Sequence, residues 1–188
     1  MLHLNHIRLA HFFWEHTLLP TSFAIDATCG NGKDTKKLAE LTPNGGVIAL
    51  DIQKEALENT KRSLEDSMLT SKIHFFHQSH EEFPLFALEL TISLIIYNLG
   101  YLPGGDKSLT TQTSSTLKSL SQALSLIVPG GMISVTCYPG HPEGLIEKNA
   151  VLEKTSSLNP AQFSAYHYHN IISPTAPSLL IIKKLKHY

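Results

Sequence analysis

The apolar positions of the chain follow two patterns that alternate along most of its length. Short, nearly continuous apolar runs are typical of buried strands, and apolar residues that recur every three or four positions are typical of helices. The expected strands are residues 23–27, 46–51, 73–77, 91–97, 132–138, 163–171 and 178–184. The expected helices are 3–19, 34–41, 54–68, the periodic part of 108–125 and 145–156, and a further helical segment is expected to begin at His80.

Strands that alternate with helices indicate an α/β fold with a parallel sheet. The last two expected strands follow one another without a helix, which favours an antiparallel hairpin at one edge of the sheet. We therefore expect a Rossmann-like, seven-stranded, mostly parallel sheet with a C-terminal antiparallel hairpin and an N-terminal helix. No linker or internal repeat interrupts the pattern, so residues 1–188 are predicted to form a single domain.

A glycine turn joins the first expected strand to the helix that follows it. Asp26 lies at the end of the strand, Gly30-Asn31-Gly32 forms the turn, and Asp34 begins the helix. Glycine permits positive φ and a close approach of the backbone to a ligand, and the helix start presents free N–H groups. A strand, a glycine turn and a helix in this order are typical of a nucleotide-binding unit.

The residues around this turn exclude two common nucleotide motifs. A third fingerprint glycine is missing, because Thr35 stands at its position, and Lys33 lacks the spacing of a Walker loop. Asp51 ends the second expected strand about twenty residues after the glycines, where a carboxylate can accept hydrogen bonds from a ribose diol. An acid before the turn, an asparagine within it and Asp51 after it together indicate a nucleoside-containing cofactor.

These motifs resemble the class I S-adenosylmethionine-dependent methyltransferases. In particular, the chain resembles the small bacterial family long labelled putative rRNA methylases, whose members act as tRNA 5-(aminomethyl)uridine methyltransferases at the wobble uridine. The likeness covers nearly the whole chain. Its residues are Asp26 to Thr35, Asp51-Ile52-Gln53, Ser79-His80 and, most specifically, the string from Asn98 to Lys107.

The resemblance implies S-adenosyl-L-methionine as the cofactor, bound at the carboxyl ends of the strands. The glycine turn would hold its methionine part, Asp51 its ribose and Ile52 its adenine, while Gln78 and Ser79 would meet the adenine edge. The complete set of expected cofactor-binding residues is Asp26, Gly30, Asn31, Gly32, Asp34, Asp51, Ile52, Gln53, Gln78, Ser79, His80 and Asn98.

Asn98-Leu99-Gly100-Tyr101 resembles the Asn-Pro-Pro-Tyr loops of amino-group methyltransferases, without the prolines. The side-chain carbonyl of Asn98 and the main-chain carbonyl of Leu99 can accept hydrogen bonds from a substrate amine and aim its lone pair at the methyl group. Tyr101 can stack on an unstacked base. Asn98, Tyr101 and Asp106 are therefore the expected catalytic residues, and Leu99, Tyr101, Tyr138 and His141 are expected to contact the substrate.

Simpler interpretations stand beside several of these predictions. Asp34 is also an ordinary acid at a helix start, and His80 an ordinary residue at the start of a helical segment. Asp106 and His141, an acid and a histidine near the rim, are candidates for the proton acceptor. Methylation at a uridine ring carbon would need a cysteine nucleophile, for which Cys137 is the candidate, although a buried strand cysteine is favoured.

The composition limits the function further. Forty-two per cent hydrophobic and 16% charged residues indicate a globular chain, and a net charge of −1 predicts that contact with RNA is local. Two cysteines on separate elements favour a reducing cytoplasm, and no apolar run suits a membrane. The spacings of His3, His6, His11 and His16 favour solvated or packing roles over a metal site, and the pair His77 and His80 is weak evidence for one.

The resemblance thus implies a methyltransferase that acts on the 5-aminomethyl group of (2-thio)uridine in the tRNA anticodon loop. Methylation of rRNA or of a small-molecule amine is an alternative, as is a catalytically silent cofactor-binding or RNA-binding module. A nicotinamide oxidoreductase is disfavoured by the missing glycine. The oligomeric state is left open, with a homodimer as one option.

Overall fold

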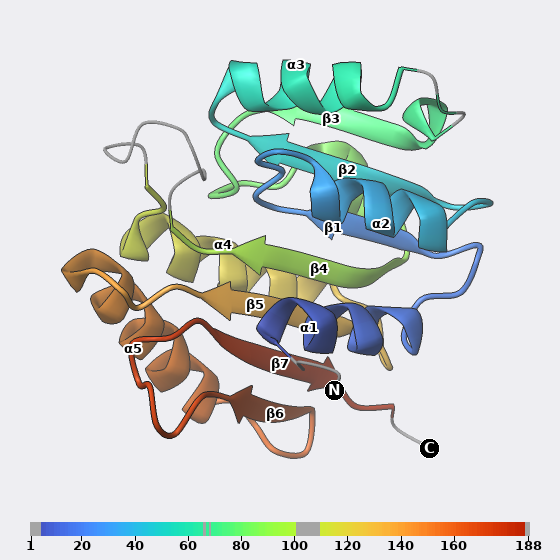
Figure 1. Ribbon diagram of the computed structural model, residues 1–188. Helices are drawn as coiled ribbons and strands as arrows, with labels where there is room; N and C mark the ends of the chain where they lie inside the picture. The colour runs from blue at the N-terminus through green and yellow to red at the C-terminus, as the bar shows by residue number, and fades with distance from the viewer. Residues whose placement is uncertain (1–4, 66, 68, 101–109, 187–188) are drawn as a thin grey trace.

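The computed structural model describes residues 5–65, 67, 69–100 and 110–186. Within them, one sheet has the strand order β3-β2-β1-β4-β5-β7-β6 (Figure 1). The first five strands are parallel, and β7 runs antiparallel to both β5 and β6. The predicted seven-stranded sheet with its C-terminal hairpin is confirmed. The strands are β1 (Phe23–Asp26), β2 (Gly46–Asp51), β3 (Ile73–His77), β4 (Ile92–Asn98), β5 (Met132–Cys137), β6 (Phe163–Tyr168) and β7 (Ser178–Lys184).

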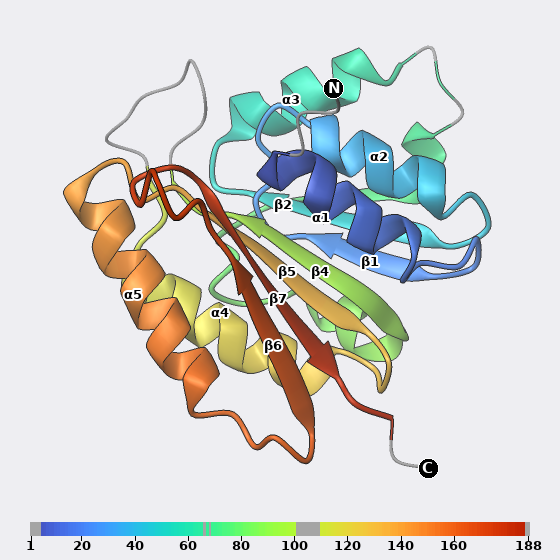
Figure 2. The same ribbon diagram turned by 60° about the horizontal axis from the view of Figure 1, so that its bottom comes forward.

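Helices cover both faces of the sheet (Figure 2). On one face lie α1 (His6–Glu15), α2 (Lys33–Leu41) and α3 (Lys54–Ser63), and on the other α4 (Thr113–Leu126) and α5 (Pro142–Ser156). Two short 3-10 helices, η1 (Thr70–Lys72) and η2 (Leu85–Glu89), precede β3 and β4.

Several elements differ from the sequence prediction: the strand expected over 163–171 ends at Tyr168, and the helix expected over 3–19 ends at Glu15. The N-terminal helix begins only at His6, because Asn5 caps it by accepting a hydrogen bond from the Arg8 backbone N–H at 2.9 Å. The helix 54–68 ends at Ser63. The helical segment expected at His80 is wrong: the chain turns there, and only η2 follows, starting directly after Pro84.

The sheet is apolar on both faces, as expected for parallel strands that are covered on both sides. Alternate residues of the strands belong to two separate buried clusters. One cluster packs Ile25, Ile95 and Ile133 against residues of α4 and α5, and the other packs Ala24, Leu94 and Ile181 against α1, α2 and α3. In the described chain no helix is long and apolar enough to cross a membrane.

The N-terminal helix packs along the sheet through a narrow apolar stripe. Ala10 and Trp14 are buried, and both belong to the cluster that contains Leu179 and Ile181 of β7. Trp14 alone can bury a large area, so it is the main anchor of the helix. This position brings the polar side of α1 toward the start of α2.

A buried polar network holds the second face together near the carboxyl ends of the strands. Glu147 of α5 is almost fully buried and accepts hydrogen bonds at 2.7 Å from the hydroxyls of Thr111 and Thr116. The Thr111 hydroxyl in turn accepts from the Gly100 backbone N–H at 2.8 Å. Glu147 therefore links α5 to α4 and to both ends of the segment that follows β4.

We expect Glu147→Ala to destabilise the protein by about 2–4 kcal/mol, since it leaves two buried hydroxyls without their acceptor and opens a cavity. Urea denaturation at neutral pH measures this change. Glu153→Ala, at an exposed position of the same helix, is the matched control and should be nearly neutral. Equal stability of the two variants would contradict a structural role for the network.

Candidate active site

The glycine turn after β1 adopts the backbone geometry that its sequence predicts. Gly30 and Gly32 have φ values of 53° and 73°, a region that other residues rarely adopt. Gly32 also lies against Thr60 of α3, where a side chain would collide with the threonine. Asn31 lies exposed between the two glycines. The turn thus depends on glycine at both positions.

The register of the sheet places one polar residue on each side of this turn. Asp26, the last residue of β1, pairs with Ala49 of β2 and with Ile96 of β4. Each neighbouring strand continues for two residues beyond that partner, and the two strands end at Asp51 and Asn98. An acid and an amide therefore flank the turn from opposite sides.

Asp51 fastens the ends of three strands to one another. Its Oδ2 accepts from the Gly30 N–H and its Oδ1 from the Gln53 N–H, both at 2.8 Å. The N–H of Gln78, directly after β3, donates to the Asp51 main-chain carbonyl at 3.1 Å. Ile52 beside it is 47% exposed, although it is a large apolar side chain. These residues form a half-buried, partly apolar rim.

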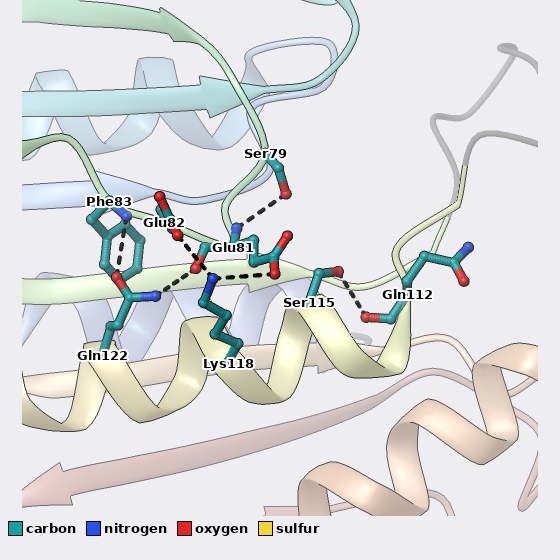
Figure 3. Close-up of polar contacts among 8 residues, drawn as sticks. All are labelled: Ser79, Glu81, Glu82, Phe83, Gln112, Ser115, Lys118 and Gln122. Carbon is teal, nitrogen blue, oxygen red and sulfur yellow. Dashed lines mark hydrogen bonds and ion pairs between the residues drawn. The ribbon is translucent and has the colours of Figure 1, made fainter.

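The segment after β3 is held against α4 by several polar contacts (Figure 3). Lys118 forms ion pairs with Glu81 and Glu82, and the Gln122 amide bonds the backbone of the same turn. Ser79 accepts from the Glu81 N–H at 3.1 Å. These contacts fix the turn against α4.

The side chains of Gln78 and His80, which both belong to this turn, make different contacts. The Gln78 side-chain N–H donates to the Glu82 carbonyl at 2.7 Å, which leaves its Oε1 as an acceptor. His80 is buried, with its Nε2 3.3 Å from the Thr116 hydroxyl and its ring edge-on to Tyr97. Burial lowers the pKa of His80 to about 4, so the imidazole is neutral at physiological pH.

Asp26 is fully buried beneath the turn. Its carboxyl accepts from the Thr35 hydroxyl at 2.6 Å and from the Thr28 N–H at 3.2 Å. Burial raises its pKa to about 7; the Thr35 hydrogen bond opposes this rise, and the charge of Asp34 adds to it. Asp26 therefore points into its own turn and supports the shape of that turn.

Asn98 is held by two side chains from the glycine-turn segment. Its backbone N–H donates to the Thr28 hydroxyl at 2.7 Å, and its side-chain Nδ2 donates to Asp34 Oδ2 at 2.9 Å. The other oxygen of Asp34 lies 2.9 Å from His11 Nε2 of α1. An amide, a carboxylate and an imidazole from three elements thus form one chain.

The remaining predicted residues lie around Asn98 or outside the described residues. Leu99 is buried and donates its N–H to the Thr136 carbonyl at 2.9 Å. Tyr138 lies edge-on to His6, with ring centroids 5.7 Å apart, and burial together with the charge of Asp34 raises its pKa. His141 caps α5 by accepting from the Gly144 N–H at 3.1 Å. Tyr101 and Asp106 lie outside the described residues.

Sequence reasoning missed three contributors to this arrangement. Thr28 and Thr35 lie within the recognised motif, where two hydroxyls close to Asp26 were a usable signal. His11 gave no such signal, because histidine spacing along α1 does not reveal which residue of α2 it meets. Among the described residues no group of three or more His, Cys, Asp or Glu side chains could hold a metal ion.

A profile of the family described as "Putative rRNA methylase" matches residues 47–184. The chain belongs to this family. It is 35% identical over 187 residues to the chloroplastic tRNA (mnm(5)s(2)U34)-methyltransferase of Arabidopsis thaliana, covering 94% of this chain and 68% of the relative. The match extends well beyond the glycine turn, so the predicted family resemblance is confirmed.

Solved structures of similar proteins give the same result. The chain resembles a putative rRNA methylase from Clostridium thermocellum with a TM-score of 0.91 and 32% identity, over 98% of this chain and 100% of the other. A protein described as a putative methyltransferase from Streptococcus mutans, solved in complex with SAH, matches with a TM-score of 0.86 and 33% identity over the same shares. This family member is an S-adenosylmethionine-dependent methyltransferase.

The pKa of Asp26 makes the stability of this methyltransferase depend on pH. The folded protein keeps the Asp26 proton up to about pH 7, whereas the unfolded chain releases it near 3.8. Its contribution is therefore fully present below about pH 4 and is lost as pH rises toward 7, at up to about 1.4 kcal/mol per pH unit.

We expect Asp26→Asn to lack this dependence, because its amide is neutral throughout the range. Urea denaturation between pH 4 and 8 should show that the free energy of unfolding of wild type falls relative to that of the variant as pH rises. Parallel stability curves would show that Asp26 is ionised in the folded protein across the whole range.

Proposed function

We propose that the chain transfers a methyl group from S-adenosylmethionine to the amine of 5-aminomethyluridine, or its 2-thio form, at the tRNA wobble position. The name of the Arabidopsis relative describes a methyltransferase for the corresponding nucleoside at position 34. The match spans 94% of this chain, which includes β4, Asn98 and the residues after it. The tRNA anticodon loop is accordingly the proposed partner.

The orientation of the Asn98 amide is the observation that carries this proposal. Its Nδ2 is engaged by Asp34, so its Oδ1 is the atom left to accept a hydrogen bond. A carbonyl oxygen at this point suits a substrate N–H donor, as an amine provides. The main-chain carbonyl of Leu99, one residue further, is proposed as the second acceptor.

These two acceptors would act on the amine in two ways. By accepting its N–H bonds they fix the direction of its lone pair, which must point at the methyl carbon. They also stabilise the positive charge that develops on nitrogen during the transfer. The bound cofactor supplies the sulfonium methyl group. A primary amine requires no covalent bond to the enzyme.

The residues around the glycine turn fit the cofactor. Gly30 and Gly32 are proposed to lie along its methionine part, and the Asp51 oxygens, which can each accept a second hydrogen bond, to accept from the ribose hydroxyls. The exposed Ile52 is suited to pack on adenine, and Oε1 of Gln78 to accept from its exocyclic amine. Asn31, Asp34, Gln53, Ser79 and His80 remain proposed neighbours of the cofactor.

The part of the site that contacts the substrate is proposed to be small and to contain aromatic side chains. A net charge of −1 provides no general attraction to RNA, so recognition would rest on local contacts. Tyr138 lies half-buried beside the site and is proposed, with Tyr101, to contact the base. His141 and Asp106 remain proposed contacts of the substrate, and a reducing cytoplasm remains the proposed compartment.

Methyl transfer to isolated tRNA tests the proposed function directly. Purified protein and labelled cofactor would be incubated with tRNA that carries 5-aminomethyl-2-thiouridine, with rRNA, and with small primary amines. Nucleoside mass spectrometry should show the methylaminomethyl product in tRNA alone. A methylated nucleoside from rRNA, or turnover of the small amines alone, would favour the other substrates and reject the tRNA proposal.

We expect Asp51→Ala to weaken cofactor binding by about 1.5–3 kcal/mol, or roughly 10- to 150-fold. The loss reflects the missing acceptors for the ribose hydroxyls and the Gly30 N–H. Calorimetry with S-adenosylhomocysteine measures it. Glu55→Ala, an exposed acid in the first turn of α3, is the control for a general charge effect. Unchanged affinity in folded Asp51→Ala would remove this carboxylate from the cofactor site.

We expect Cys137→Ala to retain most of the methyl transfer rate. Burial raises the pKa of this thiol to about 12, so almost no thiolate exists at neutral pH to attack a uridine ring. Cys29, the other free and buried cysteine, is in the same condition. Initial rates with modified tRNA, beside a thermal melt of the variant, measure the effect. A folded Cys137→Ala protein without turnover would instead support methylation at a uridine ring carbon, with Cys137 as the nucleophile.

A further inference from the structure

We propose that Asp34 and His11 are positioning residues that set the direction of the Asn98 amide, so that helix α1 forms part of the active site. This inference rests on the proposed function for its chemical meaning, since an amine is the group that Asn98 would orient. The contacts themselves join protein side chains only.

The first step concerns the amide of Asn98 and the carboxylate of Asp34. A carboxylate can only accept hydrogen bonds, so the Nδ2 group of Asn98 must face it. The reversed amide would place its carbonyl oxygen against a negatively charged oxygen at about hydrogen-bond distance, which is repulsive. Asp34 therefore selects one of the two amide orientations and directs Asn98 Oδ1 away from itself.

The second step concerns what holds Asp34. Its two oxygens are occupied by donors from two different elements, Asn98 of β4 and His11 of α1. The Asp34 side chain is only 20% exposed, so water has limited access to compete for these positions. With both oxygens held, the carboxylate cannot turn about its own axis without breaking a hydrogen bond.

The third step concerns His11. Its Nε2 must carry a proton to bond a carboxylate, a condition that one neutral tautomer and the protonated ring both meet. The ring packs at a tilt on the buried Trp14, with centroids 4.7 Å apart. The packing of Trp14 against the sheet thus fixes His11, His11 fixes Asp34, and Asp34 fixes Asn98.

The charge of Asp34 also acts on the same small region. It helps to raise the pKa of Tyr138, secondary to burial, and it opposes the burial that lowers the pKa of His6. A carboxylate in this place favours the ammonium that methylation produces on the substrate nitrogen. This charge adds to the effect of the neutral Asn98 and Leu99 carbonyls, which stabilise the same positive charge through their dipoles.

Four variants test the proposal in the intact protein. Asp34→Asn keeps the size of the side chain but can pair with either orientation of Asn98. His11→Phe keeps a ring against Trp14 but removes the donor, and His11→Gln returns an N–H donor. His16→Ala is the matched control, because His16 lies on an exposed part of the same region and bonds only the Phe12 carbonyl among its described partners.

In methyl transfer assays we expect kcat to fall roughly 100-fold for Asp34→Asn and roughly 10-fold for His11→Phe, the scale of a misplaced orienting group. In His11→Phe the Kd for S-adenosylhomocysteine should stay close to wild type, since His11 is not among the proposed cofactor neighbours. His11→Gln should recover much of the rate, and His16→Ala should retain it. Full activity of Asp34→Asn, or an equal loss in His11→Gln and His11→Phe, would overturn the proposal.

A second measurement does not depend on the substrate. The side-chain amide signals of Asn98 can be assigned in a ¹H–¹⁵N spectrum by their loss in Asn98→Ala. They should shift in Asp34→Asn and His11→Phe and stay in place in His16→Ala. Unmoved signals would reject the positioning role. If the signals shift as expected while wild type fails to methylate the tRNA, the proposed substrate is wrong and the positioning chain still holds.

Discussion

The parallel pairing of β1 with β2 and β4 is the constraint on which the rest of the site depends. This register carries both neighbouring strands two residues past the partner of Asp26. Asp51 and Asn98 consequently stand on either side of the glycine turn, within reach of Gly30 and Thr28. A change of one residue in either pairing would turn these side chains to the opposite face of the sheet.

Three carboxyl groups lie around one turn, and each is stabilised in a different way. Asp51 is held by backbone N–H groups, and Asp34 by an amide and an imidazole. Asp26 accepts from a hydroxyl and a backbone N–H, and burial raises its pKa so that it keeps its proton up to about pH 7. These differences separate Asp26, which is fully buried beneath the turn, from Asp34 and Asp51, which are only partly buried. Aspartates that lie close together in the fold therefore carry different physical roles.

The fold and the parts of the site that depend on strand order were predictable from sequence. Apolar periodicity located every strand, and the rule that ligands bind at the carboxyl ends of parallel strands grouped Asp51, Gln78 and Asn98. The burial of Asp26 and the contact between His11 and Asp34 were not predictable. Both depend on how α1 and α2 pack on the sheet, and the repeat of apolar residues along a helix does not specify its neighbour's side chains.

The packing of α1 against β7 has a consequence for biosynthesis. Trp14 packs in a cluster that includes Leu179 and Ile181, so the first helix of the chain rests on one of its last strands. A chain emerging from the ribosome cannot complete this contact until β7 has been made and paired, because contacts between distant segments form late. The ordering of Asn98 through His11 would then await the synthesis of β7, and a nascent chain that lacks β7 would not yet hold Asn98 in this way.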